Sequence, residues 1–154
     1  DYAHTPEAIR AALTALRPST PGSLAFVTGA GGDRDRDKRH AMGTAAAEVA
    51  DLVVVTDDNP RSEHPGRIRA GLLEGVADTR AAGRHGIRGL EVGHRRQAIR
   101  EAVAAVWGQG ESATVAVVGK GHESGQEIAG VVHPYDDRAE LAQALHLAAS
   151  GTPE

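Results

Sequence analysis

The chain has 154 residues, a formal net charge of −4 at pH 7 and no cysteine. This length is sufficient for one domain with a hydrophobic core. The acidic balance argues against a nucleic-acid-binding protein, which normally carries a basic surplus. No apolar run approaches the roughly 20 residues of a membrane-spanning helix, so we expect neither a nucleic-acid nor a membrane partner. The absence of cysteine fits a reducing compartment.

The first predicted elements are a helix and a buried strand. Thr5 can cap a helix that begins at Pro6, because apolar residues then recur at helical spacing. Residues 18–22 contain helix breakers and end this helix. The consecutive apolar residues of 23–28 predict a strand that is buried on both faces of a sheet. Residues 29–39 follow with three glycines and a run of charges, which is as well explained by solvation as by binding.

The middle of the chain repeats this alternation. A helix is predicted over residues 40–50 and a second buried strand over 52–56. A polar stretch, residues 57–63, comes next and precedes a helix that begins at about Pro65. The pattern over residues 87–92 indicates a strand more weakly.

The later part of the chain begins with a strongly amphipathic helix over residues 95–107. A third buried strand is predicted over 114–118, and a glycine-rich polar loop, residues 119–123, follows it. Residues 127–132 are consistent with a small hairpin around Gly130.

The last helix begins at about Asp136, and its residues Leu141 and Leu145 are expected to face the core. Residues 150–154 are expected to form a frayed tail, which leaves one domain over residues 1–149. Strands that alternate with helices predict an α/β fold with a Rossmann-like, mostly parallel sheet flanked by helices. This fold class leaves room for one antiparallel strand.

Polar loops follow the three strands that are predicted to be buried. These loops are residues 29–39, 57–63 and 119–123. In open parallel sheets, ligands bind outside the carboxyl ends of the strands. We therefore expect the three loops to converge on one binding site.

The charges in these loops have both signs. Arg34 and Arg61 can each fork onto a carboxylate or a phosphate. Asp58 and Glu123 can each hold an ammonium group, and Gly119 lets the backbone approach a ligand closely. Such a mixture suits a zwitterion, for example an amino acid, better than a nucleotide phosphate.

Some features of the loops have ordinary explanations. Asn59-Pro60 is a common way to open a turn. Gly119-Lys120-Gly121 lacks the spacing of a phosphate-binding Walker loop, and Lys120 is expected to be solvated. The eight histidines are scattered without metal-ligand spacing, so no metal site is predicted.

Four motifs in this order resemble those of one family, the Mur ligases. They are Asp1-Tyr2-Ala3-His4-Thr5-Pro6, Gly31-Gly32-Asp33-Arg34-Asp35, Asp58-Asn59-Pro60-Arg61 and Gly119-Lys120-Gly121-His122-Glu123. Asp136-Asp137-Arg138 before the last helix fits as well, so the resemblance runs from residue 1 to about residue 147. The motifs are most similar to those of the ligases that add the third residue of the peptidoglycan peptide.

The resemblance implies the C-terminal, amino-acid-binding domain of a three-domain cytoplasmic ligase. Such an enzyme uses ATP to add diaminopimelate to UDP-N-acetylmuramoyl-L-alanyl-D-glutamate in peptidoglycan synthesis. In the family, the first domain holds the UDP-sugar peptide, and the central domain carries the ATP-binding P-loop, the magnesium ligands and a carbamylated lysine. This chain has no recognisable P-loop, so ATP and Mg²⁺ are expected to bind mainly outside it. Alone, it is expected to be an inactive monomer without cofactor or metal.

The family's contacts to diaminopimelate match seven positions of this chain. They are Arg34, Asp58, Asn59, Pro60, Arg61, Gly119 and Glu123. By the resemblance, Arg61 takes the distal carboxylate of diaminopimelate, while Asp58 and Glu123 face its distal ammonium. Asp1 and His4 match the segment that reaches the nucleotide at the seam between domains.

Two alternatives remain open. One is a free-standing binding module for a zwitterionic metabolite. The other is the C-terminal domain of a different ligase that shares this fold, such as a folylpolyglutamate or cyanophycin synthetase, although Asp58-Asn59-Pro60-Arg61 disfavours it. The sequence leaves the stereoisomer of diaminopimelate, meso or LL, undecided.

Overall fold

Four parallel strands form the central sheet, in the order β3-β2-β1-β4. The strands are β1 (Leu24–Thr28), β2 (Leu52–Val55), β3 (Arg88–Glu91) and β4 (Thr114–Val117). The structure is a computed structural model that describes residues 2–109 and 112–151. The all-parallel sheet confirms the predicted α/β fold.

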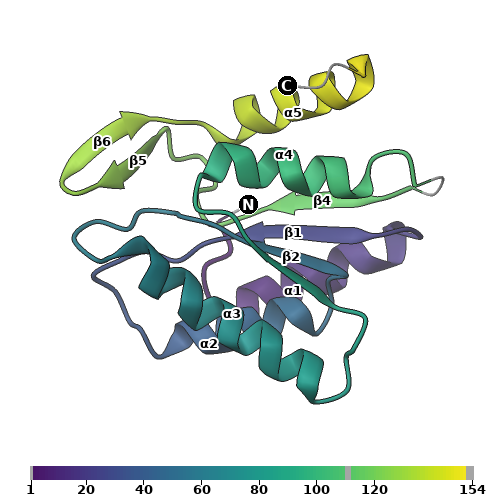
Figure 1. Cartoon of the computed structure of the whole chain (residues 1–154), viewed down its shortest axis with the longest axis horizontal. Coiled ribbons are helices and arrows are strands. Elements are labelled where there is room, and N and C mark those ends of the chain that lie inside the picture. Colours follow the sequence, from purple (N-terminus) through teal and green to yellow (C-terminus); the bar gives the residue numbers. More distant parts are fainter. Residues whose placement is uncertain (1, 110–111, 152–154) are drawn as a thin grey trace.

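Helices cover both faces of this sheet (Figure 1). The first face carries α1 (Pro6–Leu16), α2 (Lys38–Ala47) and α3 (Pro65–Ala81), and the second carries α4 (Arg95–Val106) and α5 (Asp137–Ser150). A short 3₁₀ helix, η1 (Arg17–Ser19), follows α1. Alternate residues of β1 belong to the two opposite cores: Leu24 and Phe26 to the first, Ala25 and Val27 to the second. The predicted burial of this strand on both faces is therefore confirmed.

The strand order places a topological switch point between β1 and β4. From β1 the chain passes to α2 on the first face, whereas from β4 it continues to α5 on the second face. The strands end at nearly the same level, because Thr28 pairs with Val55 and Val27 pairs with Val117. The loops that follow β1, β2 and β4 therefore emerge together, and a crevice between diverging loops is where open sheets of this type bind ligands.

Two expectations about burial are wrong. The strand predicted over 114–118 is not buried on both faces, because β4 lies at the edge of the sheet and its residues are only half-buried. Leu145 is 41% exposed instead of facing the core. Leu141, in contrast, is partly buried and packs against the core as predicted. Apolar runs and helical spacing do not reveal where a sheet ends, and residues near its edge have fewer neighbours.

The predicted hairpin is confirmed, and it lies outside the main sheet. Its strands are β5 (Gly125–Ile128) and β6 (Val131–Pro134). Ala129 and Gly130 connect them with φ of 49° and 78°, as a two-residue type I′ turn requires. The hairpin projects beyond the carboxyl ends of the strands (Figure 1).

The N-terminal caps of α1 and α5 agree with the sequence, whereas α2 begins and ends two to three residues earlier than the predicted 40–50. Thr5 caps α1 by accepting a hydrogen bond from the backbone N–H of Ala8 at 3.2 Å. Asp136 caps α5 in the same way, and Gly151 ends that helix with φ of 63°. Of the expected tail, residues 152–154 lie outside the described residues. None of the helices described is long and apolar enough to cross a membrane.

Helices α2 and α3 touch through their backbones. A Cβ atom on Gly43 would lie 1.9 Å from the carbonyl oxygen of Leu72, and one on Gly75 would lie 2.1 Å from that of His40. Any side chain at either glycine would collide with main-chain atoms. Each helix follows one of the polar loops, so this contact also sets the distance between those loops.

A buried ion pair joins the same two loops. Arg39 is 5% exposed and donates to both carboxylate oxygens of Glu63, at 2.8 and 3.1 Å. Glu63 also accepts a 2.7 Å hydrogen bond from the backbone N–H of Asp33. These contacts, the Arg39 hydrogen bonds above all, lower the pKa of Glu63 to about 2. Solvation of the whole charge run 33–39 is therefore the wrong reading for Arg39, whose partner is far away in the sequence.

We expect Gly75→Ala to destabilise the chain by about 1–3 kcal/mol, because the cost of overpacking exceeds the gain in helix propensity. For a chain of this size, that lowers the melting temperature by about 2–12 °C. Gly86→Ala is the control, since no atom lies within 4 Å of the added Cβ and surface changes cost less than about 0.5 kcal/mol. Equal melting temperatures for the two variants would show that α2 and α3 are not in backbone contact.

We expect the Arg39–Glu63 pair to make the stability of the fold depend on pH in the acidic range. The pKa of Glu63 is lowered from 4.5 to about 2 on folding, so its contribution is complete above pH 4.5 and disappears as the pH falls to 2. Glu63→Gln should be less stable than wild type at pH 7 but should lose less stability between pH 4.5 and 2. Thermal melts across this range test it, with Glu101→Gln, an exposed glutamate on α4, as the control that should follow wild type.

Candidate functional site

A crevice of about 420 Å³ opens outside the carboxyl ends of β1, β2 and β4. It is lined by the three polar loops and by the segment before α1. The lining residues that the sequence singled out are His4, Arg34, Asp58, Asn59, Arg61, Gly119 and Glu123. The prediction that the three loops converge on one crevice is therefore confirmed.

Two further residues of the predicted set are placed differently. Pro60 does not line the crevice: its carbonyl group lies against Gly32, where a Cβ atom would come within 1.9 Å of the Pro60 oxygen. Asp1 lies outside the described residues.

Seven further residues line the crevice that were not predicted as site residues: Tyr2, Gly29, Ala30, Gly31, Asp35, Lys38 and Met42. Their types do not distinguish them from ordinary loop and helix residues, and only the fold brings them to the crevice.

Arg61 has an unusual backbone conformation. Its φ of 52° lies in the left-handed region, which is unfavourable for a residue with a Cβ atom and often marks functional positions. The hairpin holds it there, because its N–H donates to the carbonyl of Glu127 at 3.3 Å and its carbonyl accepts from the N–H of Ala129 at 3.0 Å. The guanidinium donates from Nη1 to the carbonyl of Gly32 at 2.8 Å, and its Nε lies 3.4 Å from a carboxylate oxygen of Glu127.

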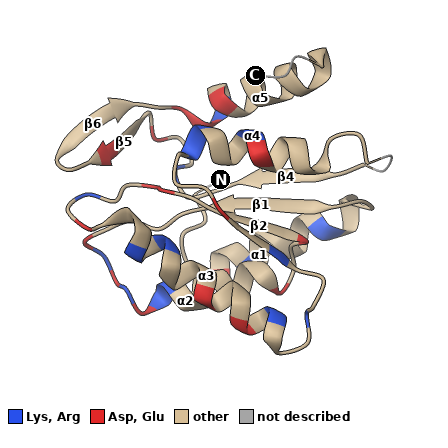
Figure 2. Ribbon diagram, in the orientation of Figure 1, with Lys and Arg blue, Asp and Glu red and all other residues tan. Residues whose placement is uncertain are grey.

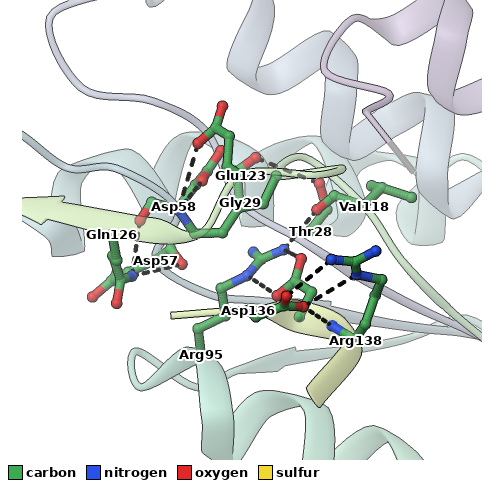
Figure 3. Close-up of polar contacts among 12 residues, drawn as sticks. Thr28, Gly29, Asp57, Asp58, Arg95, Val118, Glu123, Gln126, Asp136 and Arg138 are labelled. Carbon is green, nitrogen blue, oxygen red and sulfur yellow. Dashed lines mark hydrogen bonds and ion pairs between the residues drawn. The ribbon is translucent and has the colours of Figure 1, made fainter. Parts of the chain in front are cut away.

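The amide of Asn59 joins three segments. Its Oδ1 accepts from Lys120 Nζ and from the backbone N–H of Glu127, each at 2.9 Å. Its Nδ2 donates to Glu123 Oε2 at 3.0 Å. Beside it, Gln126 donates to the carbonyl of Asp58 at 2.8 Å (Figure 3). Asn59 therefore fixes the loops and the hairpin to one another.

Lys120 is fully buried, so its expected solvation is wrong. The flanking residues Gly119 and Gly121 have φ of 111° and 55°, and this tight backbone turns the lysine inward. Its Nζ donates to Asn59 Oδ1 and, at 2.8 Å, to the carbonyl of Gly125, and it lies 3.2 Å from Asp58 Oδ1. A single lysine between glycines gives no sequence signal that it will find partners in two other segments.

Arg95 was also missed, and it supports the loop after β4 from the other face of the sheet. It is fully buried and forms two hydrogen bonds to the Asp137 carboxylate, at 2.8 and 2.7 Å. It also donates to the carbonyl of Val118 at 2.9 Å (Figure 3). The start of α4, the start of α5 and the end of β4 are thereby held together. Loss of one partner from a buried pair of this kind typically costs about 3–5 kcal/mol.

The charges of the crevice are mixed in sign. Arg34, Lys38 and Arg61 are its cations, and Asp35, Asp58 and Glu123 are its anions. Figure 2 shows basic and acidic residues interspersed at this end of the sheet. The side chains of Arg34 and Lys38 have no hydrogen-bond or ion-pair partner among residues 2–109 and 112–151. The same residues contain no cluster of three or more His, Asp or Glu side chains that could hold a metal ion.

Comparison with known proteins identifies the family. Residues 1–121 match the family model described as the Mur ligase, glutamate ligase domain. The chain is 54% identical over 145 residues to a protein of Caulobacter vibrioides named UDP-N-acetylmuramoyl-L-alanyl-D-glutamate–2,6-diaminopimelate ligase. Proteins of the same name in Corynebacterium efficiens and Streptomyces avermitilis are each 50% identical to it. These matches cover 94% of this chain but only 27–28% of the relatives' length.

Solved structures agree in fold. A structure titled as that same ligase superposes with a TM-score of 0.83 and 40% identity, over 99% of this chain and 29% of the other. Folylpolyglutamate synthase of Mycobacterium tuberculosis has a TM-score of 0.54 and 24% identity, over 77% of this chain and 26% of its own, and shares the fold alone. The chain belongs to the Mur ligase family, in which it is the C-terminal, glutamate ligase domain.

Proposed function

We propose that this chain is the acceptor-binding domain of an ATP-dependent ligase that adds diaminopimelate to UDP-N-acetylmuramoyl-L-alanyl-D-glutamate. The observation that carries this proposal is the crevice with both signs of charge at the switch point of the sheet. The names of relatives that are about 50% identical over 94% of the chain support it.

The chemistry of the crevice fits this acceptor. Diaminopimelate has two ammonium and two carboxylate groups, so a receptor needs cations and anions within one amino acid's length. The guanidinium of Arg61 can bind the distal carboxylate, because its Nη2 has no partner among the described residues. Arg34 lines the same crevice and adds a second positive charge. Asp58 and Glu123 supply the negative charge, and Gly119 leaves room for close approach.

The other reactants belong to the remainder of the enzyme in this proposal. ATP, Mg²⁺ and the UDP-linked peptide bind mainly to the domains that make up the other three-quarters of such a ligase, in the cytoplasm. Asp1 and His4 then lie near the nucleotide where the domains meet. This chain holds the distal end of diaminopimelate and so orients its reacting amine towards the activated carboxyl group.

We expect the isolated chain to be catalytically silent. Amide synthesis of this kind proceeds through an acyl phosphate, and no P-loop was found in the sequence. Purified chain supplied with ATP, Mg²⁺, diaminopimelate and the UDP-linked dipeptide should release no phosphate, whereas a complete ligase assayed in parallel should. Turnover by the chain, free of contaminating ligase, would contradict this division of roles.

We expect Arg61→Ala in the complete ligase to impair use of diaminopimelate far more than use of ATP or the UDP-linked dipeptide. Loss of a buried, charge-assisted pair costs on the order of 2–5 kcal/mol, which is about a 30- to several-thousand-fold loss. Arg61→Lys should restore little, because an ammonium cannot form the planar fork. Steady-state kinetics with each substrate varied in turn, beside a thermal melt, measure the effect.

The matched control is Arg10→Ala, which removes an arginine of α1 that forms an exposed ion pair with Glu48, the residue at the end of α2. It should leave all three substrates unaffected, because exposed pairs contribute little. Normal use of diaminopimelate by Arg61→Ala would refute its proposed contact with the distal carboxylate. Equal loss for all substrates, with early melting, would mean that Arg61 only supports the loop.

A further inference from the structure

Two separate segments hold the guanidinium of Arg61. In the loop after β1, the carbonyl of Gly32 accepts from Nη1 at 2.8 Å, and a Cβ atom on Gly31 would lie 2.8 Å from the same nitrogen. In the β5–β6 hairpin, a carboxylate oxygen of Glu127 lies 3.4 Å from Nε. Two of the three guanidinium nitrogens therefore face protein atoms, and Nη2 is the one that remains for a ligand.

The main chain of Glu127 is bound to the loop that carries Arg61. Its N–H donates to Oδ1 of Asn59 at 2.9 Å, and its carbonyl accepts from the N–H of Arg61 at 3.3 Å. A parallel bridge between Arg61 and Ile128 continues this pairing. The carboxylate of Glu127 thus reaches Arg61 from a backbone that is fixed against the same loop.

The orientation of the guanidinium matters for recognition. An arginine side chain has many rotatable bonds, and ordering them on binding reduces the affinity for a ligand. Contacts that order the side chain beforehand remove this cost. The planar fork also matches a carboxylate only when its plane and direction agree with those of the ligand. A guanidinium held by Gly32 and Glu127 meets both conditions before the acceptor arrives.

The charge of Glu127 acts against its effect on orientation. A carboxylate beside Arg61 competes with the carboxylate of the acceptor for the same cation. The Glu127 side chain is 38% exposed, so water and salt screen this competition. Screening does not weaken the steric and directional constraint on the guanidinium, and we expect that constraint to have the larger effect.

We infer that Glu127 and Gly31 are positioning residues, which orient Arg61 so that its Nη2 meets the distal carboxylate of the acceptor. Glu127 holds Nε, and the missing side chain of Gly31 leaves the space that Nη1 occupies. Each residue acts through Arg61. The inference rests on the proposed function and extends it from the binding arginine to the residues that select its orientation.

Three substitutions in the complete ligase test this inference. Glu127→Ala removes the carboxylate and keeps both main-chain hydrogen bonds. Glu127→Gln keeps an uncharged oxygen acceptor at the same place. Gly31→Ala places a methyl group against Arg61, whose Nη1 is the nearest atom to it. Each substitution is made both in the wild-type ligase and in the Arg61→Ala variant.

The matched control is Glu48→Ala. The Glu48 side chain is 41% exposed and pairs with Arg10, and neither residue lines the crevice. This control removes a glutamate of similar exposure from another arginine, so it should follow wild type in every measurement.

Glu127→Ala and Gly31→Ala should each raise the KM for diaminopimelate by roughly 5- to 30-fold, as expected for a charge-assisted contact that is misaligned but not lost. The kcat, the KM for ATP and for the UDP-linked dipeptide, and the melting temperature should stay near wild type. Glu127→Gln should restore most of the loss. In the Arg61→Ala variant, each substitution should change kcat/KM for diaminopimelate little, because the group that it positions is gone.

Three results would overturn the inference. An unchanged KM in Glu127→Ala or Gly31→Ala would show that this residue does not orient Arg61. A lower KM in Glu127→Ala would show that its charge competes with the acceptor. An equal loss with and without Arg61 would show that Glu127 contacts the ligand itself or supports the fold. Failure of the proposed function looks different: Arg61→Ala alone would then use diaminopimelate normally, which refutes both.

Discussion

The ammonium of Lys120 lies where the loops after β2 and β4 meet the β5–β6 hairpin, and water does not reach it. A buried charge tolerates little displacement of its partners, because each contact that lengthens leaves it less compensated. The position of Asp58, Asn59 and Gly125 is therefore set by one group. This constraint fixes the part of the crevice that Asp58 and Asn59 line, and it ties the hairpin to the loop after β2.

A second buried cation, Arg95, supports the loop after β4 from the opposite side. Arg95 holds the end of β4 and the start of α5 through Val118 and Asp137. The short segment between Val118 and Glu123 is thus fixed from both faces of the sheet. This arrangement allows a glycine-rich loop, which is intrinsically mobile, to present Glu123 at a defined place.

Much of this domain follows from the sequence through two simple rules. Apolar runs that alternate with helical patterns predict parallel strands, and parallel strands bring the loops at their carboxyl ends together. Those rules suffice to gather Arg34, Asp58, Arg61 and Glu123 at one crevice. They do not reveal the burial of Lys120, Arg39 or Arg95, because the partner of each lies in a distant segment and burial of a charge depends on that partner. The exposure of Leu145 was missed for a related reason, since the limits of a sheet are set by tertiary packing.

The close backbone approach of α2 and α3 at Gly43 and Gly75 bears on how the specificity of such a domain can be altered. The loop after β1 leads into α2 and the loop after β2 leads into α3, so main-chain contact between these helices gives both loops a common rigid base. Loops of a different acceptor preference could be transplanted onto this base as a pair, provided that the two glycines and the Arg39–Glu63 link are kept. The distance between the two loops is therefore set by the packing of α2 against α3 and not by the loops themselves.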